Sequence, residues 1–250
     1  SAKYHPLLPK IPKEEMIRQI KLNEETLEKY FGIGPPPQLK GFFPPEMAYD
    51  ENVAKTVAEL GYEWIIAEEL SFSTEFNQVD YTKIYKVKGT AVGGDPNKLL
   101  TIYFRQRDIS YKILSGQLGT ANLFLGELSD RLTRNNYLLT AMDGETFGHH
   151  RPGMEKLLFE LYKTPNLKTG FISELPQHFS TEKITKTLPS TWALMEKDIE
   201  KNTPFARWND PENEIHKLQW KLTNLAIDTV RNSKFRCSQL NLLGASTVIL

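Results

Sequence analysis

Helical and extended hydrophobic patterns alternate along the chain. Apolar residues at helical spacing follow Pro12 and end at Gly32, and a second such stretch follows Asp50, a candidate N-cap. Apolar runs of strand length lie at residues 39–43, 63–67, 99–104 and 136–142, with a further short strand expected at 170–172. Further helices are expected at about residues 120–132, 153–162 and 211–231. Strands that alternate with helices predict an α/β fold around a parallel sheet.

Polar side chains recur where the expected strands end. Glu68 and Glu69 follow one strand, Arg105 and Arg107 follow the next, and Asp143 follows the last strong one. In α/β barrels the loops at the carboxyl ends of the strands build the active site. This repetition favours a closed barrel over an open sheet. Residues 74–98 are polar and contain glycines, so we expect them to form an excursion over the barrel mouth.

Composition narrows the class of protein. The 250 residues are expected to form a single domain, and Lys plus Arg equal Asp plus Glu at 31 each. With this balance the net charge does not attract the protein to nucleic acid or to an anionic membrane. The single cysteine, Cys237, excludes an internal disulfide and is expected to be an inert buried thiol. Without a long apolar stretch or a signal-peptide pattern, we expect a soluble cytoplasmic domain.

Residues 136–153, Asn-Tyr-Leu-Leu-Thr-Ala-Met-Asp-Gly-Glu-Thr-Phe-Gly-His-His-Arg-Pro-Gly, concentrate the candidate chemistry. The apolar run leads to Asp143 and Glu145, and His149 and His150 follow within the same turn region. Ionisable groups this crowded are costly to bury unless they pair or take part in chemistry. Glycines on both sides of Glu145 favour a functional loop over the alternative, a solvated turn after a strand.

Five segments, in chain order, resemble those of one enzyme family. Residues 143–149, Asp-Gly-Glu-Thr-Phe-Gly-His, resemble the nucleophile motif of glycoside hydrolase family 57. Residues 41–46, Gly-Phe-Phe-Pro-Pro-Glu, are similar to its Gly-x-Trp-x-Pro-Glu segment, with Phe43 in place of the tryptophan. Residues 4–9 resemble its Thr-His-Gly-x-Leu-Pro-Leu strand end, and residues 103–110 and 205–220 resemble later segments.

The resemblance implies a (β/α)7-type barrel that hydrolyses or transfers α-glucan segments with retention, without a metal or organic cofactor. Retention needs two carboxyl groups about 5–5.5 Å apart, one attacking the anomeric carbon and one protonating the leaving oxygen. Glu145 takes the position of the nucleophile, and His149 would keep it ionised or donate to a sugar hydroxyl. The other expected substrate contacts are His5, Glu46, Arg105, Arg107 and Asp143.

Two parts of the family pattern have no clear counterpart. The family's acid/base is an aspartate in a Ser-Asp context downstream, whereas residues 236–239 are Arg-Cys-Ser-Gln. Asp228 is the nearest candidate, although its helical spacing is typical of a solvated face. The family's His-x-Pro strand would precede Ser1. With about six expected strands against the seven or eight of a closed α/β barrel, we expect an incomplete barrel with exposed edges that favour self-association.

Aromatic residues offer further candidates. Trp192 and Trp208 are candidate sugar-stacking platforms, because an indole face suits a pyranose face, and burial in a core is the alternative. Trp220 is expected to be a core residue, and His216 a surface or helix-packing histidine.

Two other functions stay open. A metal-dependent deacetylase-like hydrolase would use His5, Asp143, His149 and His150 as ligands of a divalent ion, although adjacent histidines lack the spacing of one helix face. A non-catalytic glucan-binding relative would keep the cleft and have lost the acid. None of the three functions requires nucleic acid or a membrane.

Overall fold

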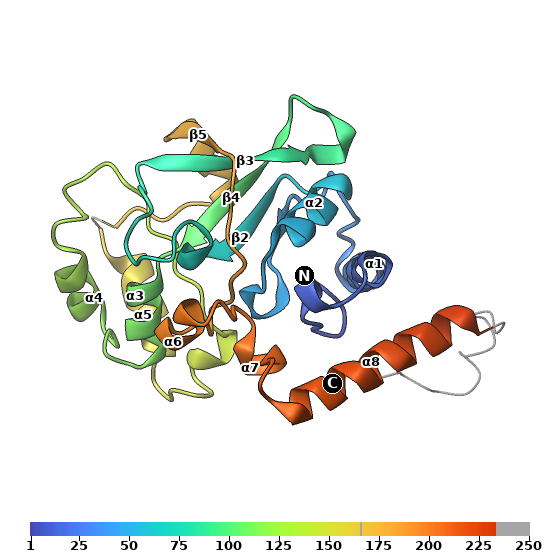
Figure 1. Ribbon diagram of the computed structural model, residues 1–250. Coiled ribbons are helices and arrows are strands. Elements are labelled where there is room, and N and C mark those ends of the chain that lie inside the picture. The colour runs from blue at the N-terminus through green and yellow to red at the C-terminus, as the bar shows by residue number, and fades with distance from the viewer. Residues whose placement is uncertain (166, 234–250) are drawn as a thin grey trace.

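A computed structural model describes residues 1–165 and 167–233, built around a mixed five-stranded sheet (Figure 1). Its strand order is β1-β2-β4-β3-β5. β1, β2 and β4 are parallel neighbours, whereas β3 runs antiparallel to β4 and parallel to β5. The strands are β1 (Gly41–Phe42), β2 (Trp64–Glu68), β3 (Lys83–Ala91), β4 (Leu99–Arg105) and β5 (Ser180–Ile184).

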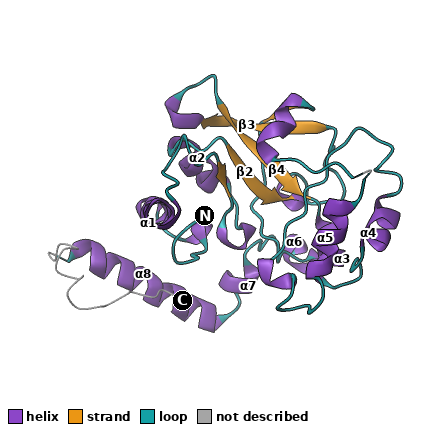
Figure 2. Ribbon diagram, turned by 180° about the vertical axis from the view of Figure 1, so that it is seen from behind, coloured by secondary structure: helices purple, strands orange, loops and turns teal. Residues whose placement is uncertain are grey.

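The helices form two groups on opposite sides of the molecule (Figures 1 and 2). α1 (Lys13–Phe31) and α2 (Glu51–Glu59) lie toward one side, and α3 (Arg107–Leu114), α4 (Ala121–Leu128) and α5 (Glu155–Lys163) gather toward the other. The later helices are α6 (Glu196–Glu200), α7 (Ala206–Asn209) and α8 (Glu214–Asn232). Short 3-10 turns occur at η1 (Leu8–Lys10), η2 (Pro45–Met47), η3 (Glu69–Ser71), η4 (Val92–Gly94), η5 (Gly144–Thr146) and η6 (Ile172–Gln177).

Local capping explains where several helices begin and end. Asp50 accepts a hydrogen bond from the backbone N–H of Val53 at 2.8 Å, which caps α2 as the sequence predicts. Gly32 ends α1 in the left-handed conformation with φ of 67°, a backbone state that favours glycine. The side chain of Gln106 accepts from the N–H of Ile109 at 2.6 Å and so begins α3 directly after β4.

Two hydrophobic clusters hold the layers together. The larger one surrounds the sheet and includes Phe42, Ile65 and Phe104, all of them fully buried. The smaller one joins α3, α4 and α5 through Ile109, Phe124 and Leu157. Part of the expected nucleophile segment packs on this smaller cluster, since Leu138, Met142 and Phe147 contact it. The segment is therefore anchored beside α3.

The predicted α/β class is confirmed, and so are the helices expected near residues 12–31, 50–60, 120–132, 153–162 and 211–231. The strands expected at 39–43, 63–67 and 99–104 are also confirmed, the first reduced to two residues. Within the described residues the sheet is open, with β1 and β5 as its edges, so the predicted barrel appears in its incomplete form.

Two strand predictions and one loop prediction were wrong. Residues 136–142 form no strand, because β4 already lies between β2 and β3 and offers them no free edge. Residues 74–98 were expected to form an excursion over the barrel mouth. They contain β3, which pairs with β4. Residues 170–172 form no strand, and β5 follows later at Ser180.

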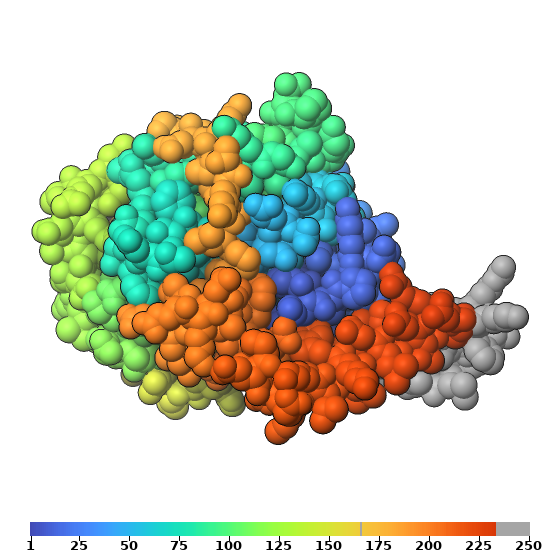
Figure 3. Space-filling view, viewed as in Figure 1, coloured from blue at the N-terminus to red at the C-terminus, as the bar shows by residue number. Residues whose placement is uncertain are grey.

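α8 lies beside α1, whose axis it crosses, and apart from α3, α4 and α5 (Figures 1 and 3). Arg231 of α8 forms an ion pair with Glu14 of α1 at 2.6 Å, and Ile227 is buried. The apolar side chains of Ile215, Leu218, Leu222 and Leu225 are each more than 60% exposed. In the described part of the chain, no helix is both long and apolar enough to cross a membrane. Cys237 and residues 236–239 lie outside the described residues.

Candidate active site at the carboxyl ends of β1, β2 and β4

The three parallel strands bring their carboxyl ends to one edge of the sheet. β2 ends at Glu68 and β4 ends at Arg105, and these two residues are direct partners in the strand register. η2, which contains Glu46, follows closely after β1. Charged groups from three separated parts of the sequence therefore meet where α/β proteins build their sites.

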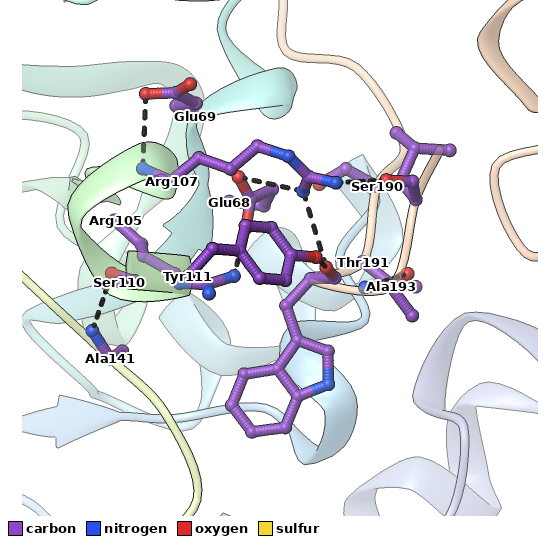
Figure 4. A network of polar contacts seen from close by, with 12 residues as sticks. Glu68, Glu69, Arg105, Arg107, Ser110, Tyr111, Ala141, Ser190, Thr191 and Ala193 are labelled. Carbon is purple, nitrogen blue, oxygen red and sulfur yellow. Dashed lines mark hydrogen bonds and ion pairs between the residues drawn. The ribbon is translucent and has the colours of Figure 1, made fainter. Parts of the chain in front are cut away.

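A buried ion cluster occupies this edge (Figure 4). The guanidinium of Arg105 donates from Nη1 to Oε2 of Glu68 at 2.7 Å, and Nη1 of Arg107 lies 3.3 Å from Oε1. Glu68 is 0% exposed and Arg105 is 1% exposed. Burial raises the pKa of Glu68, and the two guanidiniums oppose that rise. The head group of Arg105 is thus committed to an internal ion pair, and its expected contact with substrate stays a prediction without support from this geometry.

Glu69 is a second buried carboxylate at the same edge. Its Oε2 accepts long hydrogen bonds, each 3.4 Å, from the backbone N–H of Arg107 and the hydroxyl of Tyr81. Burial raises the pKa of Glu69, and the neighbouring carboxylate of Glu68 raises it further. Glu69 therefore holds its negative charge at a cost in the folded protein.

A second cluster joins His5, Glu46 and Trp192. The Nε2 atom of His5 lies 2.9 Å from Oε1 of Glu46, and the indole N–H of Trp192 donates to Oε2 at 2.8 Å. His5 and Glu46 both have positive φ, 54° and 58°, which is uncommon for residues other than glycine. Such strained backbone is concentrated at functional sites in proteins. All three residues were expected from the sequence as substrate contacts, and the structure brings them together.

The segment that carries Trp192 crosses the site from β5 to α6 (Figures 3 and 4). It is tied down by backbone hydrogen bonds between Tyr49 and Ser190 and from the N–H of Leu188 to the carbonyl of Ser71. The hydroxyl of Tyr111 donates to the carbonyl of Trp192, and Arg107 donates to the same carbonyl at 3.3 Å. The segment is therefore fixed from both strand-end clusters.

Aromatic and cationic groups stack beside this segment. The guanidiniums of Arg105 and Arg107 lie 4.9 and 4.7 Å from the centroid of the Tyr111 ring. Arg105 also lies 5.9 Å from the ring of Trp192. Phe43, which replaces the family's tryptophan, packs edge-on against Trp192 with centroids 6.0 Å apart. Tyr111 was not expected from the sequence, because nothing indicated a helix at 107–114; the aromatic residue one helical turn after Arg107 was the available signal.

Glu145 lies in the exposed turn η5 rather than at the end of a strand. Its backbone carbonyl accepts from the N–H groups of His149 at 3.1 Å and His150 at 2.7 Å, which closes the loop on itself. Gly148 has φ of 112° and so requires glycine, whereas a methyl group on Gly144 would meet nothing within 4 Å. Of the two flanking glycines, only Gly148 is needed by the backbone.

The remaining predicted residues are more scattered. Asp143, His149 and His150 are exposed, and the two imidazole rings lie 5.2 Å apart. His5 lies against Glu46, and no group of three or more His, Cys, Asp or Glu side chains in residues 1–165 and 167–233 could hold a metal ion. The structure therefore does not assemble the four ligands of the alternative metal site.

The two C-terminal candidates lie on α7 and α8. Trp208 is half-buried, and its carbonyl accepts from the indole N–H of Trp220 at 2.9 Å. Trp220 is also only half-buried, so it packs at the junction of α7 and α8 rather than in the core. Asp228 is exposed on α8, a helix that lies near α1 and apart from α5, the helix after the Glu145 turn (Figure 1). This placement does not support Asp228 as the acid.

Comparisons with known proteins agree with the fold. A family model described as glycosyl hydrolase family 57 matches residues 1–198. The chain is similar to the 4-alpha-glucanotransferase of Thermococcus litoralis, with 18% identity and a TM-score of 0.56 over 88% of this chain and 33% of that one. It is also similar to the exo-type maltose-forming amylase of Pyrococcus sp. ST04, with 14% identity and a TM-score of 0.61 over 83% and 38%.

A third solved structure, the GH57-type branching enzyme of Pyrococcus horikoshii, shares 16% identity and a TM-score of 0.61 over 88% of this chain and 50% of that one. No curated protein sequence matches the chain. The chain spans between a third and a half of the length of these three structures. At such identities the likeness shows a shared fold.

Proposed function

The chain belongs to glycosyl hydrolase family 57, and from this premise we propose that it is the α-glucan-binding and nucleophile-bearing part of a retaining glycoside hydrolase or transglycosidase. The three similar structures are named as enzymes of glucan transfer, maltose formation and branching. These names motivate an α-glucan as the substrate class. Hydrolysis and transfer differ only in whether water or a sugar hydroxyl accepts the glycosyl group.

The observation that carries the proposal is the cluster of His5, Glu46 and Trp192 at the carboxyl ends of the parallel strands. A pyranose presents apolar C–H faces and a rim of hydroxyl groups. The indole of Trp192 is half-buried and suits a sugar face, while the imidazole of exposed His5 and the carboxylate of Glu46 suit hydroxyls. Because Glu46 holds both partners, the three groups are oriented before a sugar arrives.

Glu145 is proposed as the nucleophile, on the strength of its family motif. Its carboxylate would attack the anomeric carbon and form a glycosyl ester, while a second carboxyl group about 5–5.5 Å away protonates the leaving oxygen. The same second group would then take a proton from water or a sugar hydroxyl that releases the glycosyl unit. The exposed position of Glu145 allows a sugar to approach it.

A second candidate is a glucan-binding protein without catalysis. In the described residues the carboxylate of Glu145 takes part in no hydrogen bond or ion pair. Nucleophiles are usually oriented by neighbouring groups, so this freedom favours the non-catalytic alternative. Retained binding without turnover is its signature.

The proposal is tested by Glu145→Ala with malto-oligosaccharides as substrates. We expect loss of activity with an unchanged Tm, since the side chain is exposed, and recovery of turnover when azide supplies the missing nucleophile. Glu25→Ala is the matched control, because Glu25 is an exposed glutamate on α1. Full activity of Glu145→Ala would contradict the role of Glu145. Binding of malto-oligosaccharides by a wild-type protein without any turnover would establish the second candidate.

A further inference from the structure

One face of α3 borders a cavity that no predicted site residue lines. The cavity has a volume of about 380 Å³. Its lining residues come from α3, from the turn after α3 and from the Glu145 loop: Asp108, Tyr111, Lys112, Leu114, Ser115, Gln117 and Arg151. We propose that this cavity is a glucan subsite, with Tyr111 as its aromatic wall and Arg151 as its hydrogen-bond donor. The inference rests on the proposed function and extends it to sugar units away from the cleaved bond.

Tyr111 connects the cavity to the strand-end site. Its ring lies between two guanidiniums, at 4.7 and 4.9 Å, and its hydroxyl donates to the carbonyl of Trp192. The ring is thus held in one orientation from three directions (Figure 4). Because both guanidiniums lie over the ring, Tyr111 offers the cavity its ring edge, and a side chain that is already fixed costs little conformational entropy on binding. Tyr111 is thus the residue that links the two places, since it lines the cavity and binds the carbonyl of Trp192.

Arg151 connects the cavity to the Glu145 loop. The backbone of Arg151 bridges to Phe147, and the N–H of His150 donates to the carbonyl of Glu145 at 2.7 Å. Arg151 is exposed, and its Nε donates to the carbonyl of Leu114 at 3.2 Å. Among the described residues no other hydrogen bond or ion pair engages this guanidinium. A guanidinium carries five N–H donors, so four are available to sugar hydroxyls.

The charges around the cavity favour a neutral polyol over an anion. Lys112 is neutralised by Asp108 at 2.8 Å and by Glu127 at 2.7 Å. The remaining positive charge of Arg151 is a single one on an open surface. A phosphate would find one cation and a nearby carboxylate, whereas hydroxyl groups find donors and acceptors of both kinds together with an aromatic wall. A volume of about 380 Å³ lies within the range of small-ligand sites.

The test measures binding in a Glu145→Ala background, so that the ligand is not consumed. Maltohexaose is titrated calorimetrically, with maltose as a short ligand and cellohexaose as a β-linked control. We expect Arg151→Gln to weaken maltohexaose binding about ten-fold, in line with the loss of one charge-assisted hydrogen bond. The loss of affinity for maltose should be smaller, because a disaccharide does not need to occupy both the strand-end site and the cavity.

Matched variants separate a subsite from a general effect of charge. Arg134→Gln removes the same charge from an exposed arginine outside the cavity and should leave maltohexaose binding unchanged. Tyr111→Phe keeps the ring and removes only the hydroxyl, whereas Tyr111→Leu removes the ring as well. Tyr111→Leu should therefore weaken maltohexaose binding more than Tyr111→Phe does. Equal affinities for Arg151→Gln and Arg134→Gln would overturn the subsite.

The two proposals fail in distinguishable ways. If the parent protein binds no maltohexaose, the proposed function is contradicted together with the subsite. If maltohexaose binds, Glu145→Ala abolishes turnover and Arg151→Gln changes nothing, then only the subsite is wrong.

Discussion

The indole N–H of Trp192 donates to Oε2 of Glu46 at 2.8 Å, across 146 positions of sequence. The backbone repeats the contact, because the N–H of Trp192 donates to the carbonyl of Glu46 at 3.3 Å. Glu46 thereby joins the segment after β1 to the segment that follows β5. The two segments of the proposed sugar site are linked through this one glutamate. A substitution of Glu46 or of Trp192 should therefore alter the position of both side chains.

The first prediction concerns the indole nitrogen. Trp192→Phe keeps an aromatic ring but removes the N–H donor, and Glu46 loses one of its two side-chain partners. We expect the Kd for maltohexaose to rise about ten-fold, as for loss of a hydrogen bond to a charged group. Trp220→Phe is the control, since Trp220 donates to the carbonyl of Trp208 at the junction of α7 and α8. Equal affinities of the two variants, measured by titration calorimetry, would remove Trp192 from the site.

Local sequence signals predicted the elements that depend on local chemistry. Asp50 and Gly32 mark helix ends through a side-chain cap and a left-handed residue, and both signals act within a few positions of the chain. The acidic and basic residues at the ends of β2 and β4 were also visible, because a parallel sheet places such ends together. His5, Glu46 and Trp192 were each expected in the site from the family resemblance or the residue type.

The sequence did not show features that depend on contacts between distant segments. The apolar run at 137–142 has strand character, but the edges of β4 are occupied by β2 and β3. The run instead makes isolated backbone hydrogen bonds. In one of them the N–H of Gln106 donates to the carbonyl of Leu139 at 2.8 Å. Likewise, the sequence does not show that Tyr111 lies between two arginines, because this place depends on how α3 leaves β4.

The second prediction concerns the buried ion pair of Glu68 and Arg105. Replacing Arg105 by Leu leaves a fully buried carboxylate with only Arg107 beside it, so we expect a loss of about 3–5 kcal/mol in the free energy of unfolding. The double variant Glu68→Leu with Arg105→Leu should be more stable than Arg105→Leu alone, because the fully buried carboxylate is removed together with its closest partner. Urea unfolding of the wild type, Arg105→Leu, Glu68→Leu and the double variant measures this double-mutant cycle. If the loss of stability in the double variant equals the sum of the two single losses, the pairing is contradicted.

The third prediction concerns Gly41 in β1. A methyl group on Gly41 would lie 2.0 Å from Cζ2 of Trp64, the paired residue on β2. Since a rigid indole cannot yield by that amount, Gly41→Ala should lower the free energy of unfolding by about 1–3 kcal/mol. Gly126→Ala in α4 is the control, because a methyl group there meets nothing within 4 Å and should stabilise the helix by about 0.5–1 kcal/mol. Thermal unfolding of both variants checks the contrast.

The last prediction is a pH dependence of stability from Glu69. Burial first, and the charge of Glu68 second, raise the pKa of Glu69 above its ordinary value of 4.5. A carboxyl group whose pKa is higher in the folded protein binds its proton more tightly there. Its contribution to stability is therefore fully present below pH 4.5 and is lost as the pH rises through the folded pKa. Glu69→Gln removes the titration, so its Tm should exceed that of the wild type at about pH 7, and the difference should vanish below the ordinary pKa of glutamate. Glu25→Gln on the exposed face of α1 should show no such difference at any pH. A wild type more stable than Glu69→Gln at neutral pH would mean that the folded protein favours the charged form of Glu69, through the N–H of Arg107 and the hydroxyl of Tyr81.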